Sequence, residues 1–197
     1  MNEPDEFISK GRLDAFTDGV FAFAMTLLVV NLDLPQDSNP TTGDELLAAL
    51  ARLEDTFVAY VITFFVLALF WLGRARTKEE PETASGAYAW TVLSHLFFVT
   101  FLPFSMVIAG RYDLVPAIWI YGGNMILLAL TAIAITLVIE RDIGRRLVAS
   151  GRVEFSLLIA SALLSMAISV IAPDSAMYAY FINFAAPLIR RWATATS

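Results

Sequence analysis

The stretch from Arg12 to Leu34, RLDAFTDGVFAFAMTLLVVNLDL, limits what this chain can fold into more than any other. A helix of about 20 residues rises roughly 30 Å, so this stretch is long enough to cross a lipid bilayer. It nevertheless carries the acids Asp14, Asp18 and Asp33. Acidic side chains are costly against lipid and normally face a bundle interior, a partner or water. The stretch is therefore predicted to lie inside an assembly and to contain a functional site.

Apolar residues dominate the rest of the chain as well. Of 197 residues, 58% are hydrophobic, and the mean hydropathy of +0.68 indicates a polytopic membrane protein, since soluble domains are roughly half apolar. The absence of cysteine excludes disulfides, thiolate catalysis and cysteine metal sites. A formal net charge of −6 argues against a nucleic-acid partner, which needs a basic face.

Apolar runs of bilayer length predict an all-α integral membrane protein, a single domain over residues 1–197 with six transmembrane helices. Polar or proline-containing connections separate the runs. A short helix opening at Thr42-Gly43-Asp44-Glu45 is predicted between the first two spans, returning the chain to the membrane surface. The predicted spans are about 15–34, 56–72, 88–109, 115–139, 155–172 and 176–189.

The distribution of basic residues predicts the orientation. Of the 13 Lys and Arg residues, all but Arg52 and Arg111 fall on the side of the N-terminus. Lys and Arg are retained on the cytoplasmic side, so both termini are expected to be cytoplasmic, in agreement with an even number of spans. The N-terminal segment lacks the basic region and cleavage site of a secretory signal, so the first span is expected to remain in the mature protein.

The segment from Arg12 to Ala22, RLDAFTDGVFA, resembles the signature R-x-x-x-F-S-D-G-V-F-A of the transmembrane protein 175 family of endosomal, lysosomal and bacterial potassium channels. Thr17 stands where the family usually has Ser. The resemblance is dense over residues 12–30 and otherwise rests on the six-span architecture. It implies the bacterial single-repeat form, a homotetramer in the bacterial inner (plasma) membrane. The first helix of each copy would then line a potassium-permeable pore.

A single stripe follows one face of the first span. Its residues recur at helical spacing of three and four: Gly19, Phe23, Thr26, Leu27, Val30 and Leu34. On a span taken at random such a stripe is usually helix packing, but the family motif favours a pore lining. A pore of this kind would be almost uncharged and would gate by dewetting, and the chain has no TVGYG filter sequence.

The resemblance also assigns the layers of this stripe. The position seven residues after the motif phenylalanine Phe16 is the narrowest pore layer in the family, and here it is Phe23. Family members usually have Ile or Leu there. Positions that correspond to Thr26, Leu27 and Val30 form further layers, and the threonine ring is implicated in potassium preference.

A second candidate group lies near the cytoplasmic face. Asp18 lies about one turn, and His95 about two turns, inside that face on the first and third spans. Intramembrane charges usually pair, so a polar cluster of Asp18 with His95 or with Arg12 is expected. The resemblance implies that Phe16, Thr17 and Asp18 form a hydrogen-bonded clasp that holds the pore helix to its neighbours.

The residues give little support to other classes of function. A lone histidine without cysteine or an H-E-x-x-H spacing makes neither a metal site nor a catalytic triad, so no enzyme, catalytic residue, metal site or cofactor is expected. The alternative function is a secondary transporter of a small cation or solute, which would need broken helices and a polar site at mid-bilayer.

Asn124 and Asn183 could form hydrogen bonds between helices, although packing is favoured for both. The expected partners are further copies of the chain and membrane lipid, with K⁺ as the conducted ion.

Overall fold

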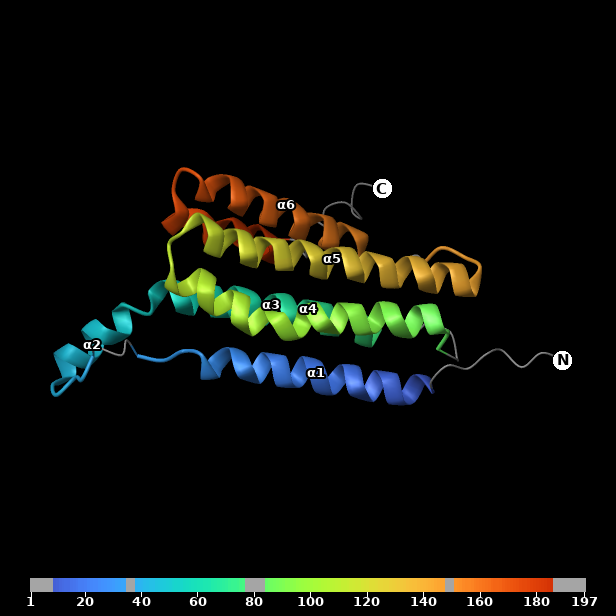
Figure 1. Ribbon diagram of the computed structural model, residues 1–197, viewed down its shortest axis with the longest axis horizontal. Helices are drawn as coiled ribbons and strands as arrows, with labels where there is room; N and C mark the ends of the chain where they lie inside the picture. Colours follow the sequence, from blue (N-terminus) through green and yellow to red (C-terminus); the bar gives the residue numbers. More distant parts are fainter. Residues whose placement is uncertain (1–8, 35–37, 77–83, 148–150, 186–197) are drawn as a thin grey trace.

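The computed structural model describes residues 9–34, 38–76, 84–147 and 151–185, which form a bundle of antiparallel helices (Figure 1). Apolar side chains recur on the inner face of each helix except α2, and burying them against neighbouring helices holds the bundle together. The elements are α1 (Lys10–Val30), α2 (Gly43–Ala51), α3 (Glu54–Arg76), α4 (Gly86–Arg111), α5 (Val115–Ile143), α6 (Arg152–Ser169) and the 3₁₀ helix η1 (Pro173–Ala185).

Among the described residues, α1, α3, α4 and α5 are long and apolar enough to cross a membrane. These helices coincide with the first four predicted spans. The predicted fifth span corresponds to α6, whose apolar part, Val153–Ser169, is shorter. The predicted sixth span falls on η1, and residues 186–189 of that prediction lie outside the described residues.

The helix ends differ from the predicted ends for local reasons. The first span was predicted to reach residue 34, but α1 ends at Val30 because the Asn31 side chain donates to the Leu27 carbonyl over 2.8 Å and so caps the last turn. By contrast, α5 extends beyond its predicted end at residue 139 and includes a charged turn. It stops at Gly144, whose φ of 69° is a left-handed conformation that glycine adopts without strain.

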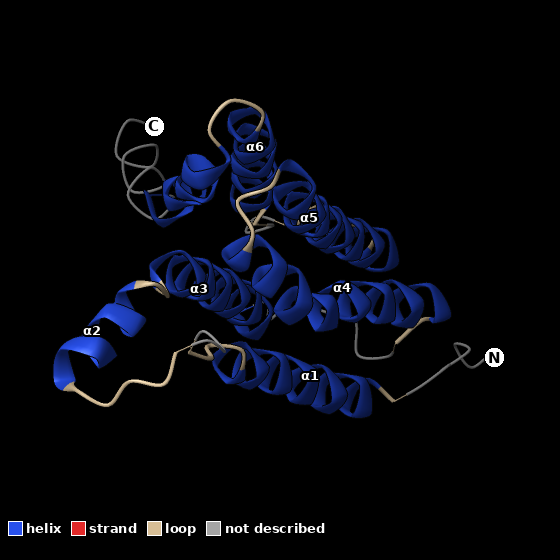
Figure 2. Cartoon of the chain, turned by 60° about the vertical axis from the view of Figure 1, so that its left-hand side comes forward, coloured by secondary structure: helices blue, strands red, loops and turns tan. Residues whose placement is uncertain are grey.

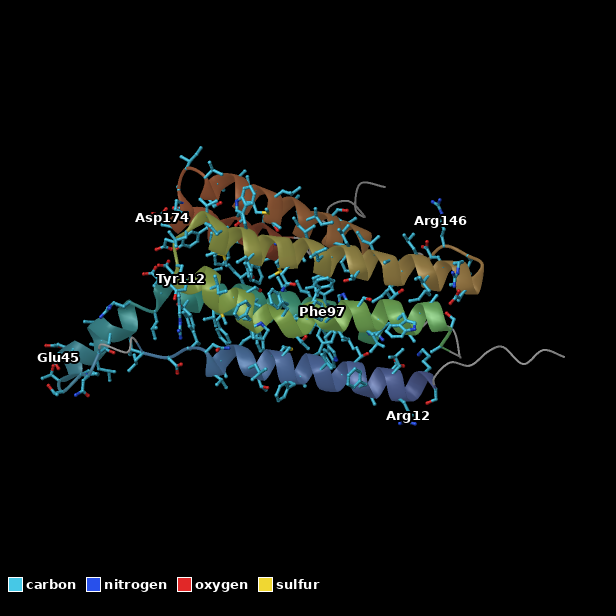
Figure 3. The ribbon with its side chains drawn as sticks, viewed as in Figure 1. Arg12, Glu45, Phe97, Tyr112, Arg146 and Asp174 are labelled. Carbon is cyan, nitrogen blue, oxygen red and sulfur yellow. The ribbon has the colours of Figure 1, made fainter. Side chains whose placement is uncertain are left out.

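The chain runs up and down the bundle. In Figure 1, α1, α4 and α6 run in one direction and α3, α5 and η1 in the other, so α1 begins at the end at which α3 and α5 finish. Figure 3 places Arg12 and Arg146 at this end of the bundle, and Glu45 and Asp174 at the opposite end. We refer to these as the Arg12 end and the Glu45 end.

Polar side chains connect the spanning helices at several levels. The Thr56 hydroxyl on α3 donates to the Gly110 carbonyl on α4 over 2.7 Å. A Cβ at Gly110 would lie 2.7 Å from the Thr56 Cα, so glycine is needed for this close approach. Deeper in the bundle, the Thr63 and Tyr121 hydroxyls are 2.8 Å apart and join α3 to α5.

Asn124 and Asn183 both form hydrogen bonds between helices. The sequence favoured a packing role for both. Asn124 on α5 donates to the Phe98 carbonyl and to the Ser105 hydroxyl of α4, each over 3.3 Å. Asn183 on η1 donates to the Ser161 hydroxyl of α6 over 2.8 Å. Neighbouring helices place acceptors opposite these amides, because a buried amide without a partner would be costly.

The short predicted helix is confirmed as α2, which projects beyond the bundle at the Glu45 end (Figures 1 and 2). It begins with a capping box: the Thr42 hydroxyl accepts from the Glu45 amide, and the Glu45 carboxylate accepts from the Thr42 amide, each over 3.3 Å. The Thr41 amide also donates to this carboxylate over 2.7 Å. Hydrogen bonds from Thr41 and Thr42 lower the pKa of Glu45 below its usual value.

Candidate functional site

Helix α1 lies at the edge of the bundle, where it packs on α4 and α3 (Figures 1 and 2). One face is apolar and buried, because its residues follow the helical repeat of three and four. The buried residues of this face are Leu13, Thr17, Phe21, Ala24 and Leu28. The opposite face of α1 contacts no other described helix, so it is available to solvent, lipid or another copy of the chain.

The predicted pore stripe lies on this open face. Phe23 exposes 65% of its surface and Val30 exposes 66%. Gly19 and Thr26 are also exposed, and Leu27 is half-buried at the boundary with the packed face. From Gly19 to Val30 the predicted stripe is therefore one continuous surface of α1, and Leu34 is exposed beyond the end of the helix. The role of the stripe as a pore lining stays a prediction.

The Thr26 hydroxyl has a defined orientation on this face. It donates its hydrogen to the Phe23 carbonyl over 2.8 Å, within α1 itself. A hydroxyl oxygen has two lone pairs and one hydrogen, so this bond leaves the oxygen free to accept a further hydrogen bond or to bind a cation.

The structure separates the residues of the predicted clasp. Thr17 is buried, and its hydroxyl donates to the Leu13 carbonyl of its own helix over 2.8 Å. Phe16 points away from the bundle and is 55% exposed. Phe16 therefore shares the open face with Phe23 and does not pack beside Asp18.

Asp18 pairs with neither of its expected partners. Its carboxylate accepts from the indole N–H of Trp71 on α3 over 3.0 Å. The Arg12 side chain is exposed and has no hydrogen-bond or ion-pair partner within the described residues. The expected Asp18–His95 and Asp18–Arg12 pairs are thus replaced by an Asp18–Trp71 pair, because α3 rather than α4 faces Asp18.

His95, on α4, is buried and lies on a different side of α1 from Asp18. Its Nδ1 atom lies 2.9 Å from the Thr131 hydroxyl on α5. Its ring contacts the rings of Phe21 on α1 and Phe70 on α3, with centroids 6.1 and 5.4 Å away. His95 therefore reaches α1 through an aromatic contact three residues beyond Asp18.

Comparison with known proteins agrees with the motif. The family model described as endosomal/lysosomal potassium channel TMEM175 matches residues 12–103, beginning at Arg12, the first residue of the signature. A curated potassium channel of Chamaesiphon minutus is 31% identical over 135 residues, which cover 66% of each chain. The chain belongs to the TMEM175 family.

Two further likenesses extend this result. The human endosomal/lysosomal proton channel TMEM175 is 32% identical over 108 residues, covering 52% of this chain and 21% of the human protein. A crystal structure described as a lysosomal potassium-selective channel TMEM175 homolog from Chamaesiphon minutus superposes with a TM-score of 0.70 at 22% identity, covering 87% of this chain and 92% of that chain. This second likeness establishes a TMEM175 fold.

The chain spans 66% of the Chamaesiphon relative and smaller shares of the other curated relatives described here. The matched family is one of ion channels rather than enzymes.

The TMEM175 motif also contains a charged residue that sequence reasoning did not place in the site. Asp14 accepts from Lys10 Nζ and from Arg74 Nη2, each over 3.1 Å. The i,i+4 spacing of Lys10 and Asp14 could have signalled the first contact. Arg74 follows Trp71 by one helical turn on α3, but nothing in the sequence indicates that α3 packs beside α1.

Proposed function

We propose that the chain is a potassium-permeable channel, in which a homotetramer places α1 of each copy around a central pore. The proposal extends to the whole protein the function in the names of its bacterial relatives. One observation carries it: the open face of α1 presents Phe23, Thr26 and Val30 together, opposite the face that packs on the bundle.

The open face supplies the parts that such a pore requires. Apolar rings at Phe23 and Val30 would expel water from a narrow segment, so an ion would cross a dewetted barrier that acts as a gate. The Thr26 oxygens, which donate to the Phe23 carbonyl and keep their lone pairs, would replace part of the hydration shell of K⁺. The channel needs no resident cofactor, because K⁺ is the transported ion.

The proposed arrangement has six membrane segments, with α6 and η1 forming the last two. The Arg12 end would be cytoplasmic, because it carries the excess of basic residues. The protein would then be a multi-pass protein of the bacterial inner (plasma) membrane. Membrane lipid would cover the remaining outward apolar surface.

A secondary transporter is the weaker alternative. Transporters build substrate sites from discontinuous helices at mid-bilayer. Each of the four spanning helices within the described residues is continuous. Unitary current steps would support the channel, whereas transport without resolvable steps would support the transporter.

Reconstitution of the full chain into planar bilayers tests the proposal. We expect single-channel currents in KCl, and a reversal potential that favours K⁺ when NaCl replaces KCl on one side. Protein-free bilayers and a Thr26→Val variant are the controls. Currents no larger than those of the protein-free bilayer, from protein that elutes as a folded oligomer, would contradict the proposal.

The human relative is named a proton channel, so proton permeation is the second candidate function. Vesicles that enclose a pH-sensitive dye distinguish the two ions, because acidification in the absence of K⁺ reports proton entry. A proton flux that persists when K⁺ current is absent would favour this second function.

A further inference from the structure

We propose that Arg74 positions the pore helix α1 through its ion pair with Asp14, and that this pair sets the rotation of α1 about its own axis. Asp14 and Arg74 are then positioning residues for Phe23 and Thr26. This inference rests on the proposed function, because it assigns a consequence to the direction in which the open face of α1 points.

Two side-chain hydrogen bonds, one helical turn apart, join α1 to α3. Asp14 and Asp18 are four residues apart on α1, so they lie on the same side of the helix. Arg74 and Trp71 are three residues apart on α3 and face them in order: Arg74 Nη2 donates to Asp14 and Trp71 Nε1 donates to Asp18. Both bonds lie on one flank of α1, so rotation of this helix about its own axis would stretch both of them.

Burial makes the Arg74–Asp14 bond stronger than the Trp71–Asp18 bond. The Arg74 side chain is 18% exposed and the Asp14 side chain 35% exposed, whereas the Asp18–Trp71 bond lies at the surface. Arg74 Nη1 is buried without a hydrogen-bond partner in the described part of the chain, and Asp14 is the carboxylate that pairs with Arg74 there. A largely buried cation whose charge partner is removed must move or find another, so loss of Asp14 should disturb α3 as well as α1.

The Arg74 nitrogen that donates to Asp14 also contacts α4. Nη2 lies 3.5 Å from the Tyr88 hydroxyl, and Tyr88 is completely buried on α4. The guanidinium thus links α1, through Asp14, to both α3 and α4 at the Arg12 end. The link is about two and a half helical turns from Phe23, and a continuous helix transmits a rotation over that length.

Distances between α1 and α3 test the position of the helix without any conduction. The chain has no cysteine, so spin labels at Ala15→Cys and Leu72→Cys attach only there. Labelled chain is diluted with unlabelled chain so that one copy per assembly carries the pair. We expect one narrow distance distribution in the parent background, and a broadened or displaced one in both Asp14→Asn and Arg74→Gln.

Single-channel recording tests the functional consequence. Asp14→Asn and Arg74→Gln should each change open probability by about fivefold or more, the effect of a coupling near 1 kcal/mol. Unitary conductance in the open state and the K⁺ to Na⁺ ratio should stay unchanged. The double variant Asp14→Arg with Arg74→Asp should lie closer to wild type than either single variant does.

Arg141→Gln is the matched control, since it removes a cation from the Arg12 end whose ion-pair partner, Asp142, is on its own helix. Arg141→Gln should leave the distances between the spin labels and the open probability unchanged. Unaltered label distances in both single variants, or a charge swap that rescues nothing, overturn the inference. If wild-type protein carries no current, the proposed function fails, and the label distances still decide whether Arg74 positions α1.

Discussion

Trp71 donates its indole N–H to the Asp18 carboxylate over 3.0 Å, and this bond joins α3 to α1 within the TMEM175 motif. The motif acid thus holds the candidate pore helix to the bundle by a bond to an aromatic donor. Because the bond is lateral, it leaves the open face of α1 free.

Trp71→Phe should weaken this junction, because it keeps an aromatic ring and removes the N–H donor. A hydrogen bond to a charged acceptor at a partly exposed site is worth about 1 kcal/mol. The melting temperature in detergent should fall by about 2–4 °C for a chain of this size. Trp90→Phe is the control: its indole is 64% exposed and makes no hydrogen bond within the described residues. Equal melting temperatures for the two variants would show that the bond contributes nothing.

Phe23→Ala should raise the K⁺ current, because it removes a bulky aromatic ring from the proposed constriction and lets water enter it. Phe23→Asn should raise it as well, since an amide holds water there. Planar-bilayer recording measures both effects. Phe97→Ala on α4 is the matched control, since Phe97 is also 65% exposed (Figure 3). If neither Phe23 variant alters conductance, the side chain faces protein or lipid.

Thr26→Val should mainly reduce the preference for K⁺ over Na⁺, because it keeps the shape of the side chain and removes the hydroxyl oxygen. Loss of one ligand layer of this kind is worth about 1 kcal/mol, or roughly fivefold in the permeability ratio. Thr26→Ser keeps the hydroxyl and should retain the selectivity. The measurement is the reversal potential under bi-ionic conditions. Identical reversal potentials for the valine and serine variants would exclude the hydroxyl from ion selection.

Low pH should reduce the stability of α2. Hydrogen bonds lower the pKa of Glu45 in the folded chain, so its contribution to stability is present above the unfolded pKa, near 4.5, and is lost as the pH falls through the lowered value. A spin label at Leu47→Cys should therefore become more mobile as the pH falls from 5 to about 3. With Glu45→Ala the label should be mobile at every pH. A mobility that follows the same pH curve in both proteins would assign the effect to other groups.

Topology can be tested with single cysteines at exposed positions of the two ends. Asn39→Cys and Ser175→Cys lie at the Glu45 end and should react with a membrane-impermeant maleimide in intact cells. Gly11→Cys and Arg146→Cys lie at the Arg12 end and should react only after the cells are permeabilised. Labelling of Arg146→Cys from outside would reverse the proposed orientation.

The sequence by itself determined the features that depend on local periodicity and on depth in a membrane. The first four apolar runs are helices, Thr42 and Glu45 start α2, and the stripe with Phe23, Thr26 and Val30 lies on one face. Helical repeat and burial of apolar surface fix these properties without reference to neighbours. The motif from Arg12 to Ala22 also determined the family, since it is a property of the residues alone.

Only the tertiary structure decided which side chains meet. The sequence placed Asp18 and His95 at similar depths, but depth is one coordinate, and the angle about each helix axis and the identity of the adjacent helix come from packing. Packing brings α3 beside Asp18, so Trp71 and not His95 is its partner, and it brings Arg74 to Asp14. His95 meets Thr131 of α5 instead. Pairing across helices depends on how whole apolar faces interlock, which no local pattern in the chain specifies.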